Sequence, residues 1–132
     1  MGLTRALDAP GTAQRPRVDR TAGVLVGSRC DECLATSWPA RAVCHRCGRA
    51  SMSQSRFSPR GTLLTHTEVW TPRLGLGVPY RLGQVQLEDG PLVFCHVRGL
   101  AAGRPVPLPV RIVLADDDAA VPPFWFEPEE GG

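Results

Sequence analysis

The chain has 132 residues, enough for one ordinary domain or two very small ones, and 42% of them are hydrophobic. Its formal net charge is +2, and no apolar stretch approaches the length of a membrane span. All fifteen basic residues are arginine, which excludes lysine Schiff-base chemistry and a lysine-based phosphate loop. Thirteen prolines and fourteen glycines interrupt the chain so often that we expect no long helix.

The charge is divided unevenly along the chain. Residues 1–60 hold ten arginines and four acidic residues, a net of +6, whereas residues 61–132 hold five arginines and nine acidic residues, a net of −4. A basic first half could attract phosphate, either in nucleic acid or in a phosphorylated cofactor. The alternative is that the arginines only solvate a small module, and the sequence leaves both interpretations open.

Residues 1–23 are rich in Pro, Arg, Gly and Thr without a sustained period, which predicts a mobile N-terminal arm. The first twenty residues carry four arginines and no apolar run, so we expect no signal peptide and a reducing, cytoplasmic location. The apolar segment 23–28 then predicts a short strand. We expect residues 35–43 to return as a hairpin and residues 51–57 to lead out of this module.

Two close pairs of cysteines form the strongest motif: Cys30 with Cys33, then, ten residues later, Cys44 with Cys47. This spacing predicts a structural zinc site with four thiolate ligands, although the gap is shorter than in the common pattern. Disulfides within the pairs would be strained and would suit a redox enzyme, but no thioredoxin-like βαβ pattern surrounds them. Iron in a rubredoxin-like site is the weaker competitor.

Four cysteine ligands leave no open position for water, so we expect the metal to be structural and not catalytic. His45 lies between two ligands and is interpreted as a solvated residue of the turn. Gly48 follows the second pair, where a turn favours a residue with positive φ, whereas Leu34 occupies the equivalent position after the first pair.

From Gly61 onward the sequence has β character. The expected strands and turns, in chain order, cover residues 62–70, 80–87, a hairpin turn at 88–90, 92–97, a short segment at 103–106, 110–114, a turn at 116–118, and 124–126. Five or six short strands in about 65 residues predict a small Greek-key barrel. Periodicity alone does not separate an OB-fold from an SH3-like barrel.

A catalytic site is not expected. Cys95 and His66 could in principle form a nucleophilic pair, but alternation places Cys95 on the same strand face as Val93 and Val97, as a small core residue. Nucleic-acid binding is the rival function, because zinc ribbons and OB-folds both bind nucleic acids. The barrel half is net acidic and several of its aromatic residues lie at strand ends, which favours contact with protein instead.

Taken in order over residues 24–128, these pieces resemble the thiolase-associated family in which a rubredoxin-like zinc ribbon precedes an OB-fold. The motifs that carry the resemblance are Cys30-x2-Cys33, Trp38-Pro39-Ala40-Arg41-x2-Cys44-x2-Cys47-Gly48, Gly61-Thr62-Leu63-Leu64-Thr65-His66-Thr67, Pro79-Tyr80-x4-Val85-x-Leu87-Glu88-Asp89-Gly90, Gly103-Arg104-Pro105-Val106 and Phe126-Glu127-Pro128. Leu34 departs from the glycine common in the family after the first pair. The resemblance implies a mostly β protein with an N-terminal arm (1–23), a zinc ribbon (24–57), a five-stranded OB-fold barrel (58–128) and a short tail (129–132).

The resemblance also implies a function. Members of this family look like non-catalytic subunits that bind thiolases or thiolase-like enzymes, including retro-aldolases of steroid side-chain breakdown and acyltransferases. We therefore expect a thiolase-like partner in a 2:2 assembly, one structural zinc per chain, and possible contact with CoA. Candidate partner-binding residues are two aromatic anchors and the arginines of the arm: Trp38, Trp70, Arg5, Arg15, Arg17 and Arg20. The alternative for the two tryptophans is that they only cover the core.

Overall fold

The computed structural model describes residues 17–73, 75–117 and 120–129, and all regular elements within them are β-strands. These residues form two compact units. The first contains residues up to 58 together with residues 89–91, and the second contains residues 59–88 and those from 92 onward. Within the described residues no helix is long and apolar enough to cross a membrane.

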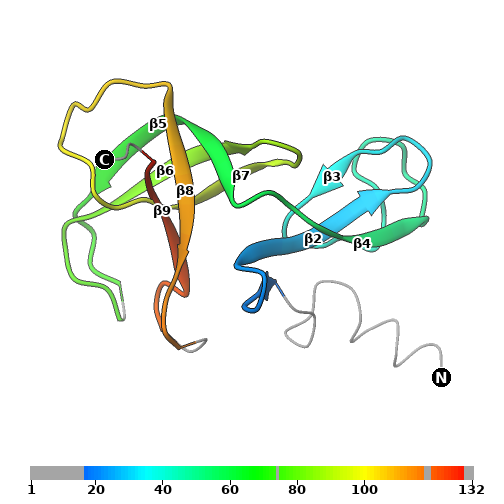
Figure 1. Ribbon diagram of the computed structural model, residues 1–132, viewed down its shortest axis with the longest axis horizontal. Coiled ribbons are helices and arrows are strands. Elements are labelled where there is room, and N and C mark those ends of the chain that lie inside the picture. The colour runs from blue at the N-terminus through cyan, green and yellow to red at the C-terminus, as the bar shows by residue number, and fades with distance from the viewer. Residues whose placement is uncertain (1–16, 74, 118–119, 130–132) are drawn as a thin grey trace. The chain divides into compact units, whose positions relative to one another are not determined.

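The first unit is built around β2 (Val24–Cys30), which pairs antiparallel with three short strands. These are β1 (Val18–Asp19), β3 (Thr36–Ser37) and β4 (Met52–Arg56) (Figure 1). The strand predicted at 23–28 therefore extends to the first cysteine. β1 lies inside the range predicted as an arm, and the predicted arm residues Arg5 and Arg15 lie outside the described residues.

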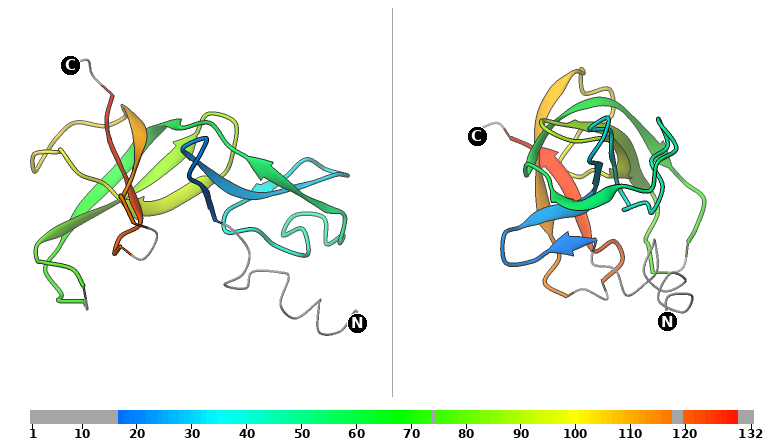
Figure 2. Two further views of the ribbon diagram at one scale, coloured as in Figure 1. Left: turned by 60° about the horizontal axis from the view of Figure 1, so that its bottom comes forward. Right: turned by 90° about the vertical axis from the view of Figure 1, so that its right-hand side faces the viewer.

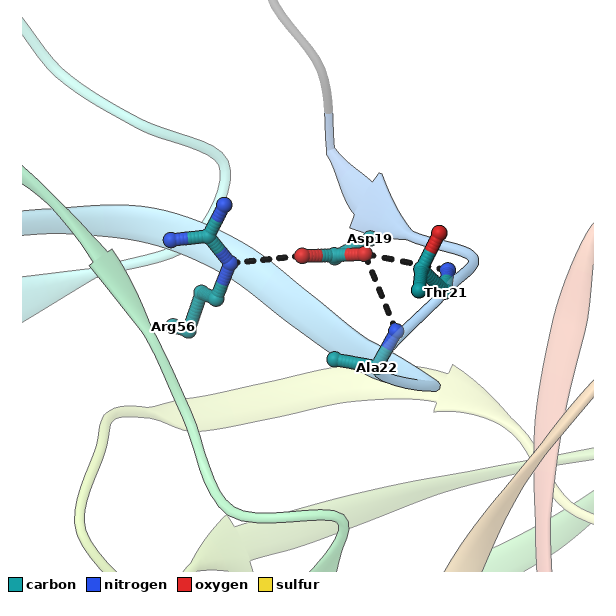
Figure 3. A network of polar contacts seen from close by, with 4 residues as sticks. All are labelled: Asp19, Thr21, Ala22 and Arg56. Atoms are coloured by element: carbon teal, nitrogen blue, oxygen red, sulfur yellow. Dashed lines mark hydrogen bonds and ion pairs between the residues drawn. The ribbon is translucent and has the colours of Figure 1, made fainter.

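Asp19 fixes the turn that joins β1 to β2 (Figure 3). One oxygen of its carboxylate accepts hydrogen bonds from the backbone N–H groups of Thr21 and Ala22, both at 3.0 Å. The other oxygen pairs with the Nε of Arg56, on β4, at 2.6 Å. The Ala22 N–H and the Arg56 guanidinium hold the pKa of Asp19 below its ordinary value. This one side chain thus fastens the first strand to the ribbon sheet.

Phe57 is the largest side chain fully buried in the first unit, with 2% of its surface exposed. Its ring lies so close to Gly90 that a Cβ at that position would stand 2.8 Å from a ring carbon. The hairpin turn predicted at 88–90 is present, between β6 and β7, but Gly90 does not have the positive φ that is common in such turns. Close approach of the ring, and not backbone conformation, requires glycine here.

The second unit is a five-stranded antiparallel barrel, in the order β7-β6-β5-β8-β9. Its strands are β5 (Arg60–Val69), β6 (Tyr80–Leu87), β7 (Leu92–His96), β8 (Leu108–Leu114) and β9 (Phe124–Pro128). A parallel bridge between Val97 and Phe126 closes the ends of the sheet on each other. This order and closure are those of an OB-fold, and Figures 1 and 2 show β8 and β9 crossing the direction of β5, β6 and β7.

The five-stranded barrel was predicted, but the segment 103–106 is not a strand. Gly103 has a φ of +79°, which turns the chain, and the prolines at 105 and 107 cannot donate a ladder hydrogen bond. β8 begins only at Leu108 and is longer than the predicted strand 110–114. Alternating inward residues fill the barrel core, among them Leu63, Val85, Leu87, Val93, Val97, Val110 and Phe126, all 2% exposed or less.

Candidate metal centre

The four cysteines of the two pairs meet in the first unit, with all four sulfurs within 4.8 Å of one another. The Sγ atoms of Cys30 and Cys47 are 3.6 Å apart, and those of Cys33 and Cys44 are 3.5 Å apart. Zn–S bonds of about 2.3 Å in a tetrahedron place sulfurs about 3.8 Å apart, whereas a disulfide joins them at about 2.05 Å. The geometry therefore fits one zinc ion with four thiolates, and all the cysteines are free thiols.

The two cysteine turns are built in the same way. In the first, the Leu34 N–H donates to the Cys30 carbonyl at 3.0 Å, and in the second the Gly48 N–H donates to the Cys44 carbonyl at 3.0 Å. Leu34 and Gly48 occupy equivalent positions, with φ of +67° and +78°. The positive φ predicted for Gly48 is confirmed, and Leu34 adopts the same conformation against the preference of a residue with a Cβ.

Backbone N–H groups lie near the sulfurs of Cys44 and Cys33 and favour their thiolate form, whereas burial and the neighbouring cysteine thiols raise the pKa of Cys47 to about 11. The N–H groups of Cys47 and Arg46 point at the Sγ of Cys44, at 3.4 and 3.3 Å. The hydrogen bond from Cys47 is the largest cause of a pKa of about 6 for Cys44. The Ala35 N–H likewise lowers the pKa of Cys33. A metal ligand must be a thiolate, so these bonds prepare the site for a cation.

Cys30 and Cys44 are buried with Ala35, and Met52 packs against them, so the site has its own small apolar core. His45 is exposed and stands outside the four-sulfur group. Four thiolates complete the tetrahedron and leave no position for a reacting water. Zinc bound here would cross-link the two turns, which is a structural role.

The Cys95–His66 pair is not assembled as a nucleophile and base. His66 on β5 and Cys95 on β7 are both register partners of Gly83, so β6 lies between them. His66 accepts from Arg81 at Nδ1 (3.0 Å) and donates from Nε2 to a backbone carbonyl (2.9 Å). Cys95 is buried, as predicted, and burial raises its pKa to about 12.

The predicted partner-binding residues have different settings. The Nε1 of Trp38 donates to the carbonyl of Arg17 at 3.0 Å, which places the indole as a cover beside β1. Trp70 is 64% exposed just beyond the end of β5, and its Nε1 donates to Glu68. Arg17 and Arg20 are exposed. Their roles as partner contacts remain predictions.

One feature of the barrel was missed in the sequence. Leu92 and Phe94 alternate with buried residues along β7 and point outward, 47% and 63% exposed. Their register partners on β6 are Gln86 and Gln84, both uncharged. Alternation places Val93 and Cys95 on the core face, as predicted, so Leu92 and Phe94 occupy the other face; that this outward face is also apolar was not used in the sequence analysis.

A four-cysteine ribbon followed by a five-stranded barrel defines a zinc-ribbon OB-fold protein. The family model described as "ChsH2, rubredoxin-like zinc ribbon domain" matches residues 19–53, and the one described as "ChsH2, C-terminal OB-fold domain" matches residues 54–115. The chain therefore belongs to the ChsH2 family of zinc-ribbon OB-fold proteins.

Two archaeal relatives are called DUF35 domain-containing scaffold proteins. That of Pyrococcus furiosus is 35% identical over 75 residues, 55% of this chain and 54% of the relative, so the match spans about half the length of each. That of Methanothermobacter thermautotrophicus is 26% identical over 111 residues, 78% of this chain and 84% of the relative. The benzoylsuccinyl-CoA thiolase subunit BbsA of Thauera aromatica is 25% identical over 93 residues, 70% of this chain and 60% of that subunit.

Among solved structures, a chain of the Ltp2–ChsH2(DUF35) aldolase is similar, with a TM-score of 0.66 and 20% identity. The match covers 86% of this chain and 98% of that one. A DUF35 family protein from Sulfolobus solfataricus has a TM-score of 0.55 and 16% identity, over 79% of this chain and 75% of that one. At these identities the likeness concerns the fold.

Proposed function

We propose that this protein is a non-catalytic, zinc-binding scaffold subunit that binds and stabilises a thiolase-like enzyme acting on acyl-CoA substrates. The observation that carries the proposal is the family itself, since relatives are called scaffold proteins and one is a subunit of a thiolase. The aldolase that contains a similar chain is named as a complex of two proteins, which agrees with a role as a subunit.

The site chemistry supports a role without independent turnover. The four-thiolate centre has no open coordination position, and Cys95, with a pKa of about 12, is a protonated thiol at neutral pH. Acyl transfer needs a nucleophile with an adjacent base. Within the part of the chain that the structure describes, no base is hydrogen-bonded to the thiol of Cys95, and β6 lies between it and His66.

The outward face of β7 supports a protein partner. Leu92 and Phe94 present an apolar strip in the middle of a strand, and their register partners on the next strand are neutral glutamines. Exposed aromatic residues often concentrate the binding energy of an interface, and Trp70 is a second such residue in this unit. We propose these three side chains as contacts of the partner enzyme.

The finer features stay predictions: a 2:2 assembly, contact of the subunit with CoA in the complex, a role in lipid or steroid breakdown, and a cytoplasmic location. Binding of single-stranded nucleic acid is the second candidate, favoured by the exposed Phe94 on an OB-fold strand. The register partners of Phe94 and Leu92 are the neutral Gln84 and Gln86, which offer no positive charge to a phosphate backbone. We therefore prefer a protein partner.

The test is affinity capture of the tagged full chain from its host, with identification of co-purified proteins and an assay of acyl-CoA turnover. We expect a thiolase-like enzyme to be retained, activity in the captured complex, and none in the purified zinc-loaded chain alone. A Phe94→Ser variant should retain less enzyme, whereas Arg111→Gln, also exposed in the same unit, should retain the wild-type amount. Turnover by the isolated chain, or capture of nucleic acid alone, would contradict the proposal.

A further inference from the structure

The barrel unit contains a pocket of about 360 Å³ beside the start of β6 and the segment that follows β7. A second pocket of about 240 Å³ shares four of its lining residues, Leu76, Tyr80, His96 and Val121. The larger volume lies within the usual range for small-molecule sites. The metal centre lies in the other unit, so the pocket is a separate site.

Arginines gather around this pocket in a part of the chain that is otherwise acidic. Arg81 and Arg98 line the larger pocket, and Arg73 lines the smaller one. They are three of the five arginines in residues 61–132, where the net charge is −4. Among the described residues that line either pocket, Glu68 is the one carboxylate, and their charge is +2, from three arginines and one glutamate.

Two of these guanidinium groups are held in place. Arg98 lies over the indole ring of Trp125, 4.0 Å from the ring centre. Arg81 is only 13% exposed, bonded to His66 at 3.0 Å and paired with Glu68 at 3.6 Å. Pre-positioned donors of this kind bind an anion without first losing their own freedom.

Arg73 stands in the loop before β6, where a bridge to Leu76 shapes the turn. Among the described residues no carboxylate forms an ion pair with it. Burial, and then the charges of Arg98 and Arg73, lower the pKa of His96 at the wall shared by the pockets. The positive charges of Arg73 and Arg98 therefore both act on the space beside His96. Because the pKa of His96 is lowered, its ring adds no positive charge there.

We propose that this pocket binds an organic phosphate: a phosphate dianion carried on a small planar or apolar body. Guanidinium groups match phosphate oxygens in pairs, and a net charge of +2 balances a dianion. The rings of Tyr80 and His96, whose centres are 5.4 Å apart, and the apolar side chains of Leu76 and Val121 form a wall for the uncharged part. This site is independent of the scaffold role, which needs no ligand here.

The experiment titrates the zinc-loaded full chain with adenosine monophosphate, inorganic phosphate and adenosine, with binding measured by calorimetry and located by NMR at Tyr80 and His96. We expect adenosine monophosphate to bind with a Kd on the order of 1 mM or tighter and to shift both residues. Inorganic phosphate should bind more weakly at the same residues, and adenosine, which lacks the anion, should bind at least about tenfold more weakly than its phosphate.

Arg73→Gln and Arg98→Gln should each weaken binding of adenosine monophosphate about tenfold, the effect of losing one charge-assisted hydrogen bond. Arg111→Gln is the matched control, because Arg111 is exposed in the same unit but borders neither pocket. Equal weakening by Arg111→Gln would show only general charge attraction and would overturn the proposal. So would the absence of any shift at Tyr80 and His96 with both phosphates, or binding of a single-stranded oligonucleotide alone.

Discussion

The two cysteine turns allow the backbone strain at Leu34 to be measured. A residue with a Cβ in the left-handed region costs about 1–2 kcal/mol relative to glycine, and part of this is offset because glycine has more freedom in the unfolded chain. Leu34→Gly and Leu34→Ala remove nearly the same side chain, which is 62% exposed. The two variants differ mainly in the Cβ, so we expect the glycine variant to be more stable by about 1 kcal/mol.

The second turn supplies the matched substitution. A Cβ built on Gly48 meets no atom within 4 Å, so Gly48→Ala introduces conformational strain without a clash. The two turns have similar φ values and equivalent hydrogen bonds. Gly48→Ala should therefore lower the stability by as much as the two Leu34 variants differ, again about 1 kcal/mol.

Competition for zinc with a chelator is the suitable assay, since metal binding energy is folding energy in such a module. A difference of about 1 kcal/mol corresponds to roughly a fivefold change in apparent zinc affinity. We expect Leu34→Gly to hold zinc about fivefold more tightly than Leu34→Ala, and the wild type about fivefold more tightly than Gly48→Ala. If Leu34→Ala holds zinc as tightly as Leu34→Gly, the strain argument is refuted.

Three further predictions concern the metal, the β1 turn and the buried thiol. Cys44→Ser should reduce bound zinc well below one equivalent and unfold the ribbon, measured by metal analysis and circular dichroism; a full equivalent of zinc would contradict the four-thiolate site. Asp19→Ala should lower the melting temperature more than Arg56→Ala, because it removes two turn hydrogen bonds as well as the ion pair; an equal or smaller loss for Asp19→Ala would show that the two turn hydrogen bonds contribute nothing to stability. Cys95 should stay unlabelled by iodoacetamide in the zinc-loaded protein at pH 8, where a pKa of about 12 leaves roughly one thiolate in ten thousand; labelling without unfolding would show that the thiol is accessible.

The sequence was sufficient for the metal site because its information is local. The spacing of Cys30, Cys33, Cys44 and Cys47 alone specifies two tight turns that can meet at one metal, and the structure brings the four sulfurs together. The strands β6 and β7 were also predictable, since apolar residues and a turn mark them. β1 was not, because a two-residue strand carries no pattern and depends on pairing with β2 and on Asp19.

Features that depend on long-range packing could not be read from the chain. The turn at 88–90 is predictable from its residues, but the requirement for glycine at position 90 comes from the ring of Phe57, thirty-three positions earlier in the sequence. The arginine-lined pocket joins three residues from separate segments, Arg73, Arg81 and Arg98, and no local spacing connects them. The alternation of β7, by contrast, is local, and it correctly placed Cys95 with Val93 and Val97 in the core.

Native mass spectrometry of the complex captured from the host tests the central claim most directly, because one spectrum reports the partner, the stoichiometry and the metal. The account predicts an assembly of two copies of this chain with two copies of a thiolase-like enzyme, and one zinc ion for each copy of the chain. A spectrum that shows the chain alone, or bound only to nucleic acid, would contradict the scaffold function.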